Sequence, residues 1–154
     1  MLIEEKIHFL ETGCIELLRS LDAHAKGNWG VMNGQQMVEH MSEMIRMAGG
    51  KDIYAVVTPE EHLPKYKAFL LSDKEFRPNT KNPIMPEEPV MVRLSGMQEA
   101  VDEFKKEMSD FFEVFEKEPS KITTHHVFGE LNYEENVILL YKHATHHLRQ
   151  FGLM

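Results

Sequence analysis

The chain has 154 residues, of which 42% are hydrophobic and 27% charged, and its formal net charge is −8 at pH 7. These values are typical of a soluble globular domain, and we expect one domain spanning residues 1–154. The acidic balance argues against nucleic-acid binding and against docking on anionic membranes. No apolar run approaches the roughly 18 residues that a membrane-spanning helix needs.

The single cysteine, Cys14, excludes an intrachain disulfide. Because its helical-pattern neighbours Ile15, Leu17 and Leu18 are apolar, we expect a small buried hydrophobe rather than a reactive thiol. The N-terminal residues are amphipathic and acidic, unlike a signal peptide. A reducing compartment, the cytoplasm, is the simplest expectation.

Hydrophobic residues at helical spacing predict a first helix over residues 2–25. The second predicted helix begins after Asn33, which forms a capping-box pattern with Gln36, and runs to about Met47, just before two consecutive glycines. The five methionines in and just before this helix (Met32, Met37, Met41, Met44 and Met47) are best interpreted as core filler, although thioether metal ligands or a substrate-contacting surface are the alternative.

The third predicted helix starts near Ser95, with a glutamine three residues later, and ends near Pro119. The fourth opens with a capping-box pattern of Asn132 and Glu135 and runs to about Phe151. Strand signals are weak throughout. The pattern therefore predicts an all-α fold, a four-helix bundle with a long crossover between helices 2 and 3.

The crossover, residues 49–94, contains six of the seven prolines: Pro59, Pro64, Pro78, Pro83, Pro86 and Pro89. Thr58 followed by Pro59 predicts a cap and a short helix, and residues 90–94 predict a short extended piece. A connection of this length is unusual in a compact domain unless it is functional or packs as a lid.

Two histidines of the fourth helix, His143 and His147, are four residues apart. On a helical wheel both lie within about 60° of the apolar position Leu140, whereas His146 lies about 120° away. Residues at i and i+4 share a face, so two imidazoles can converge on one metal ion. The spacing selects His143 and His147 as candidate ligands over His146.

A third histidine, His40, lies on the apolar stripe of the second helix. Three imidazoles from facing helices, with coordination positions left open, are typical of a catalytic metal site. The alternative is that His40 is a hydrogen-bonded core residue. His125 and His126 precede the fourth helix and are interpreted as exposed loop residues, or as residues lining the mouth of the bundle.

Two further residues are candidates for supporting roles. Glu43 lies one turn beyond His40, so it can act as the proton-transfer partner, the catalytic residue, or hold a ligand nitrogen. The alternative is a solvent-facing charge at the edge of the stripe. Asn136, one turn before Leu140, is a candidate for orienting the ligands.

The segments His143-Ala-Thr-His-His147-Leu-Arg-Gln150 and Gln35-Gln-Met-Val-Glu-His40 resemble the signature segments of the DinB/YfiT-like superfamily. The resemblance implies a four-helix bundle that binds a divalent metal, commonly nickel or zinc, through His40, His143 and His147. Leu148-Arg149-Gln150 departs from the usual Arg-Gly-Gln, which leaves the ligands intact. Members with assigned activities are similar to metal-dependent thiol transferases and isomerases that use low-molecular-weight thiols.

Two functions follow as hypotheses. In the first, the chain is a metal-dependent enzyme, a hydrolase or thiol transferase, whose three-histidine site activates a water or thiol toward a small-molecule substrate. In the second, it is a non-catalytic metal-binding or structural bundle. A homodimer is compatible with both. The substrate, the metal and the oligomeric state do not follow from the sequence.

Overall fold

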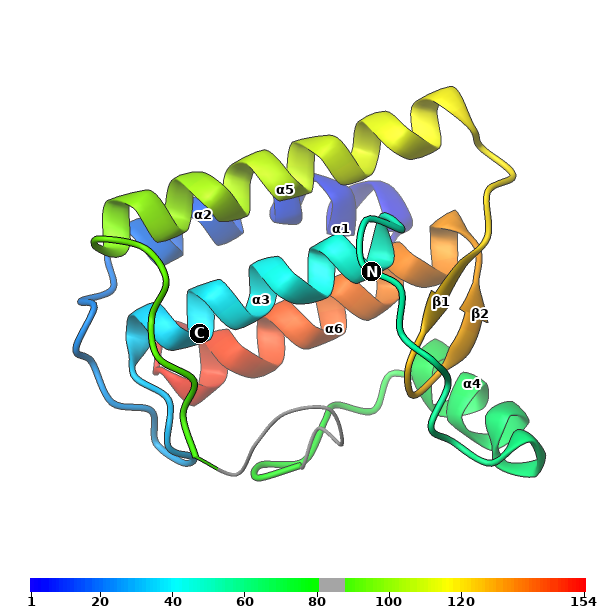
Figure 1. The fold of residues 1–154 in the computed structure, drawn as a ribbon, viewed down its shortest axis with the longest axis horizontal. Helices are drawn as coiled ribbons and strands as arrows, with labels where there is room; N and C mark the ends of the chain where they lie inside the picture. The colour runs from blue at the N-terminus through cyan, green and yellow to red at the C-terminus, as the bar shows by residue number, and fades with distance from the viewer. Residues whose placement is uncertain (81–87) are drawn as a thin grey trace.

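The computed structural model describes residues 1–80 and 88–154, and within them the chain is mostly helical with one small two-stranded sheet (Figure 1). Its elements are α1 (Ile3–His8), η1 (Phe9–Gly13), α2 (Cys14–Arg19), α3 (Gly34–Ala48), η2 (Glu60–His62), α4 (Leu63–Leu71), α5 (Met97–Lys117), β1 (Thr123–His125), β2 (Gly129–Leu131) and α6 (Tyr133–Gln150). The predicted crossover prolines Pro83 and Pro86 lie outside the described residues.

The first predicted helix is present but shorter than expected. α1, η1 (a π-helical turn) and α2 follow one another without a break and end at Arg19, not near Ala25. Side chains compete with the helical backbone at this point: the Ser20 hydroxyl donates to the carbonyl of Leu17, and Asp22 accepts from a backbone N–H two residues on. These local hydrogen bonds end the helix before the hydrophobic pattern does.

The capping boxes predicted for α3 and α6 are confirmed. Asn33 accepts from the backbone N–H of Gln36, whose side chain accepts from the backbone N–H of Asn33, and Asn132 forms the same pair with Glu135. The start of α5 differs from the prediction: it is capped by Gly96 with no side-chain hydrogen bond. Ser95 therefore does not begin this helix.

The N-terminal helical segment, α3, α5 and α6 contribute side chains to one buried hydrophobic cluster, and Figure 1 shows α3 running alongside α6. α3 packs against α5 and α6, and the N-terminal segment packs against α5 through α2 and against α6 through α1. Phe104, Phe111 and Met108 of α5 are almost completely buried there. Cys14 is also fully buried, and burial raises the pKa of its thiol to about 12, so it is an apolar core residue as predicted.

The crossover contains the expected short helix, but Thr58 does not cap it. The Thr58 hydroxyl donates to the carbonyl of Val127 instead, and η2 and α4 begin after Pro59 without a side-chain cap. Residues 90–94 form no strand. They are attached to α3, because the backbone N–H of Arg93 donates to Glu39 over 2.8 Å and the carbonyl of Leu94 accepts from Gln35 over 2.9 Å.

The all-α prediction is wrong for the segment before α6, where β1 and β2 form an antiparallel hairpin. The same segment explains Asn136, whose side-chain amide bonds to the hairpin region and not to the candidate histidine ligands. Its side-chain amide donates to the Thr123 hydroxyl over 2.9 Å and to the carbonyls of Leu131 and Asn132. Asn136 therefore attaches the hairpin to α6, and its predicted role in orienting ligands is wrong.

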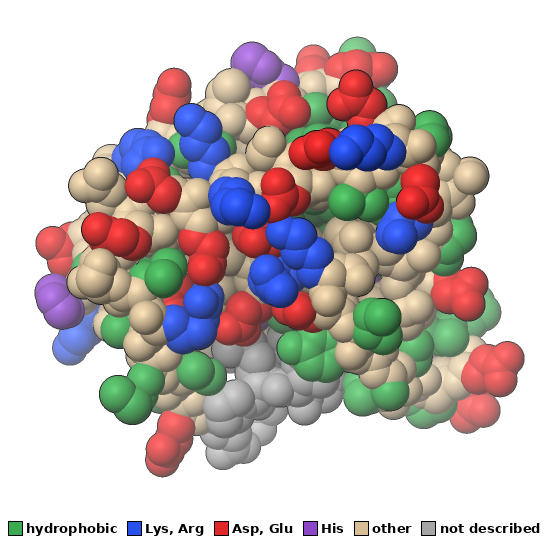
Figure 2. All heavy atoms as spheres, turned by 45° about the horizontal axis from the view of Figure 1, so that its top comes forward, with side chains coloured by type: hydrophobic (Ala, Val, Ile, Leu, Met, Phe, Trp, Pro, Cys, Tyr) green, Lys and Arg blue, Asp and Glu red, His purple; other side chains and the backbone are tan. Residues whose placement is uncertain are grey.

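On the face shown in Figure 2, Lys and Arg side chains are interspersed with Asp and Glu rather than gathered into a patch of one sign. Ion pairs between α5 and its neighbours include Arg19–Asp102 at 3.0 Å and Lys51–Asp110 at 2.6 Å. In the part of the chain that the structure describes, no helix has both the length and the apolar character required to cross a bilayer.

We predict that Asn136→Ala lowers the free energy of unfolding by about 1–3 kcal/mol, because it removes the side-chain amide that donates to the buried Thr123 hydroxyl. Chemical denaturation measures this change. Gln98→Ala, which removes an exposed amide, is the control and should change stability by less than about 0.5 kcal/mol. Equal stability of the two variants would contradict the role of Asn136 at the hairpin.

Candidate metal site

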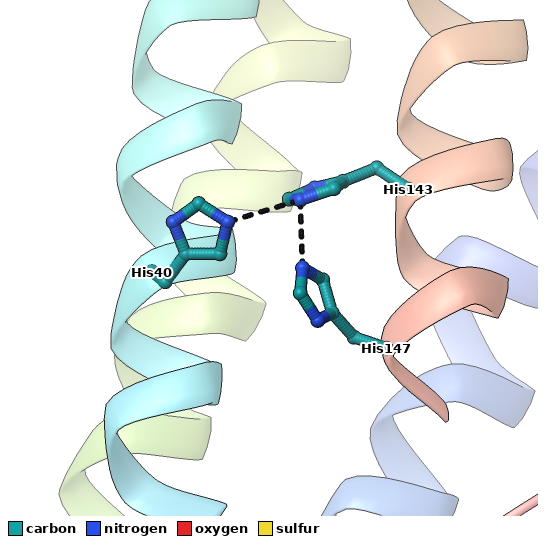
Figure 3. A group of neighbouring side chains, drawn as sticks. All are labelled: His40, His143 and His147. Carbon is teal, nitrogen blue, oxygen red and sulfur yellow. Dashed lines mark hydrogen bonds between the residues drawn. The ribbon is translucent and has the colours of Figure 1, made fainter. Parts of the chain in front are cut away.

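The structure brings together the three histidines that the sequence singled out. His40 extends from α3, and His143 and His147 extend from α6 toward it (Figure 3). The Nε2 atom of His143 lies 3.1 Å from Nε2 of His40 and 2.9 Å from Nε2 of His147. One ring nitrogen from each residue falls within 4.8 Å of the other two, close enough to hold one metal ion.

The two separations measured from His143 match metal coordination. Nitrogen ligands about 2.0–2.1 Å from a zinc-like ion are separated from one another by roughly 2.9–3.4 Å in octahedral or tetrahedral geometry. Hydrogen bonds alone cannot satisfy both contacts of His143. Its Nε2 atom faces two other ring nitrogens, but in a neutral ring this atom has either one proton to donate or one lone pair to accept with. The residues therefore fit a divalent ion.

The electrostatic environment keeps these rings neutral. Burial lowers the pKa of His40 to about 4, and burial together with the other histidines lowers the pKa values of His143 and His147 well below the usual value. A neutral imidazole offers a lone pair to a metal ion, whereas a protonated ring does not. The site is thus a set of three neutral ligands.

Gln150 orients one ligand, a role that the sequence analysis did not assign. Its Oε1 atom lies 2.7 Å from Nδ1 of His147, and its amide nitrogen donates to the carbonyl of Trp29 over 2.8 Å. A Cβ atom added at Gly27 or Gly30 would lie 2.9 or 2.8 Å from the Gln150 side chain, so this loop approaches it closely. When Oε1 of Gln150 accepts a hydrogen bond from Nδ1–H of His147, the proton of this neutral ring is on Nδ1. The lone pair on Nε2 then faces the other two histidines.

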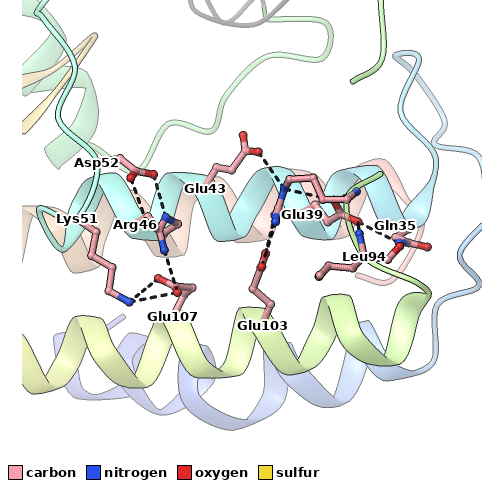
Figure 4. A network of polar contacts seen from close by, with 10 residues as sticks. Gln35, Glu39, Glu43, Arg46, Lys51, Asp52, Leu94, Glu103 and Glu107 are labelled. Atoms are coloured by element: carbon pink, nitrogen blue, oxygen red, sulfur yellow. Dashed lines mark hydrogen bonds and ion pairs between the residues drawn. The ribbon is translucent and has the colours of Figure 1, made fainter. Parts of the chain in front are cut away.

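Glu43 lies beside the site but has no hydrogen bond to the three histidines among the described residues. Its carboxylate is 3.8 Å from Nε of Arg93, and its side chain is 40% exposed (Figure 4). Burial is the main cause that raises its pKa. Glu43 and His40 both line a shallow surface depression. The catalytic role of Glu43 stays a prediction.

The other histidines near the site are less exposed than expected. His126 is only 1% exposed, and its Nδ1 lies 3.3 Å from the sulfur of Met47, so its interpretation as an exposed loop residue is wrong. His125 accepts from the backbone N–H groups of Val127 and Phe128 at Nδ1, which places the proton of its neutral ring on Nε2. Sequence reasoning missed this because the hairpin was not predicted.

His146 does not join the cluster, in agreement with its position on the helical wheel. Its ring packs against Trp29 and Phe76, with centroid distances of 5.6 and 5.8 Å, and against His147 at 5.0 Å. It therefore belongs to the aromatic wall behind the α6 ligands.

Neither a protein-family model nor a curated protein matches this chain.

We predict that Gln150→Ala weakens metal binding by roughly 10-fold to 100-fold, because the Nδ1 proton of His147 loses its acceptor. Competition titration with a chelating indicator measures the affinity. Gln150→Glu keeps an acceptor oxygen at this position and should bind metal more tightly than Gln150→Ala. Equal affinity of wild type and Gln150→Ala would show that Gln150 does not orient the ligand.

The buried histidines predict a pH dependence for the metal-free protein. In the folded protein the pKa of His40 is about 4 and that of His125 is about 3, both below the ordinary value of 6.5. At a pH between the folded and the ordinary value, these histidines therefore bind more protons in the unfolded chain than in the folded protein. The free energy of unfolding should therefore fall as pH decreases from about 6.5 to 4, by up to about 1.4 kcal/mol per pH unit for each such histidine.

Denaturation of the chelator-treated protein at several pH values tests this dependence. His125→Asn, whose side-chain oxygen can accept the same backbone hydrogen bonds, should show a shallower fall of stability with decreasing pH. An unchanged slope in this variant would indicate that His125 is not held neutral in the folded protein.

Proposed function

We propose that the chain is a metal-dependent enzyme whose divalent ion is held by His40, His143 and His147. The convergence of their three ring nitrogens within 4.8 Å is the observation that carries the proposal. Nickel and zinc are the metals we propose, since imidazole suits both and three neutral nitrogen ligands leave coordination positions open. The fold proposed with it is a four-helix bundle of the DinB/YfiT-like type, supported by the side-by-side packing of α1–α2, α3, α5 and α6.

The proposed reaction class is hydrolysis or thiol transfer on a small-molecule substrate. A divalent ion bound here lowers the pKa of a coordinated water or low-molecular-weight thiol and polarises a substrate carbonyl. In this proposal the three histidines stay neutral and Gln150 orients His147. Glu43, which lines the depression beside His40, exchanges a proton with the bound substrate.

We predict that protein produced without a histidine tag and supplied with zinc or nickel contains about one metal ion per chain. His143→Ala and His147→Ala should each abolish this content, because each removes one of three ligands. His146→Ala is the matched control on the same helix and should keep a ratio near one. Elemental analysis after gel filtration gives the ratio.

Two outcomes would contradict the proposal. A metal content near zero in wild type would contradict the metal site. An equal loss of metal in all three variants would mean that the site lies on a different face of α6. If metal binds but neither ester nor thioester substrates nor thiol acceptors react, the second hypothesis, a non-catalytic metal-binding bundle, replaces the enzyme.

A further inference from the structure

His40 has a buried nitrogen that the three-histidine cluster leaves unexplained. The ring is 6% exposed, and its Nδ1 atom has no hydrogen-bond partner among the described residues. Nε2 faces His143, so a metal ion bound at Nε2 leaves the proton on Nδ1. A buried N–H without an acceptor is destabilising, and metal-bound histidines almost always donate this proton. His147 has Gln150 for this purpose, whereas His40 has no counterpart.

The depression beside His40 contains the candidate acceptors Gln36, Glu39 and Glu43. Gln36 already uses its side-chain oxygen to cap α3. Glu39 is buried and accepts from the backbone N–H groups of Arg93 and Leu94, at 2.8 and 3.5 Å, and from the Gln35 amide at 3.0 Å. Within the described part of the chain, the Glu43 carboxylate makes only the 3.8 Å ion pair with Arg93, so it has acceptor positions to spare.

Position and charge both favour Glu43. It follows His40 by three residues on α3, which places the two side chains on one face of the helix. Arg93 depends little on Glu43, because Glu103 holds its guanidinium at 2.7 and 3.3 Å (Figure 4). Three neutral ligands leave the charge of a divalent ion uncompensated, and a carboxylate turned toward His40 supplies part of the missing negative charge.

We propose that Glu43 is a positioning residue of the metal site. When the metal is bound, its carboxylate gives up the 3.8 Å ion pair with Arg93 and accepts a hydrogen bond from Nδ1–H of His40. The inference rests on the proposed function, because it requires a metal ion at Nε2. It assigns Glu43 a role in holding a ligand, separate from any role in proton transfer to the substrate.

The test compares Glu43→Ala, Glu43→Gln and Glu103→Gln, each loaded with zinc. Glu43→Ala should weaken zinc affinity by roughly 10-fold or more. Glu43→Gln, which keeps an acceptor oxygen but loses the charge, should fall between Glu43→Ala and wild type. Glu103→Gln removes a carboxylate that pairs with Arg93 but does not line the depression, and should change affinity by less than about threefold.

A second measurement detects the hydrogen bond itself. In NMR spectra of the zinc-loaded protein with ¹⁵N-labelled histidine, the Nδ1 proton of His40 should be observable and slow to exchange in wild type and in Glu43→Gln. It should broaden or disappear in Glu43→Ala. Denaturation of each variant establishes that it is folded, as expected for a side chain that is 40% exposed.

The failure of this inference differs from the failure of the proposed function. If zinc binds to wild type and Glu43→Ala with the same affinity, and the His40 proton is the same in both, Glu43 does not hold the ligand while the metal site stands. If wild type binds no zinc, both the site and the inference are overturned.

Discussion

The constraint on which the rest of the structure depends is the mutual approach of three neutral imidazoles in the interior between α3 and α6. Ring nitrogens 2.9 and 3.1 Å apart repel through their lone pairs unless a proton or a cation lies between them. Burial lowers the pKa values of the rings, so each neutral ring carries one proton, and Nε2 of His143 can share a proton with only one of its two neighbours. A metal ion bound here would satisfy all three nitrogens at once.

Rigid elements maintain this approach. All three ligands lie within long helices rather than loops, and each helix has its start defined by an asparagine capping box, at Asn33 and Asn132. The two α6 ligands share one helical face, so only the position of α3 relative to α6 has to be maintained by packing. Core contacts made by Met37, Met41 and Leu140 provide that packing, which is why methionines of α3 belong to the core.

The parts of the site that follow from local pattern were predictable from the sequence, and the parts that follow from tertiary contact were not. Helical spacing identified His143 and His147 and set His146 apart, and apolar periodicity placed His40 inside. The role of Gln150 depends on the loop carrying Trp29, which is 121 residues away in the chain. The burial of His126 and the real partners of Asn136 depend on a hairpin whose strands are three residues long, too short for an alternating pattern to reveal.

The two sides of the histidine cluster are built differently, and under the proposed function a substrate would enter from the more open side. On the α6 side, Gln150 donates to the carbonyl of Trp29, and the His146 ring packs against Trp29 and Phe76. These contacts cover that side of the histidine cluster. Beside α3, His40 lines an open depression whose rim includes Glu43 and the exposed Met91. A small molecule reaching the metal from this side would meet a carboxylate and apolar surface before the ion. Val90, Met91 and Arg93 line this depression, so the crossover segment at residues 90–94, attached to α3 through Glu39, forms one of its walls.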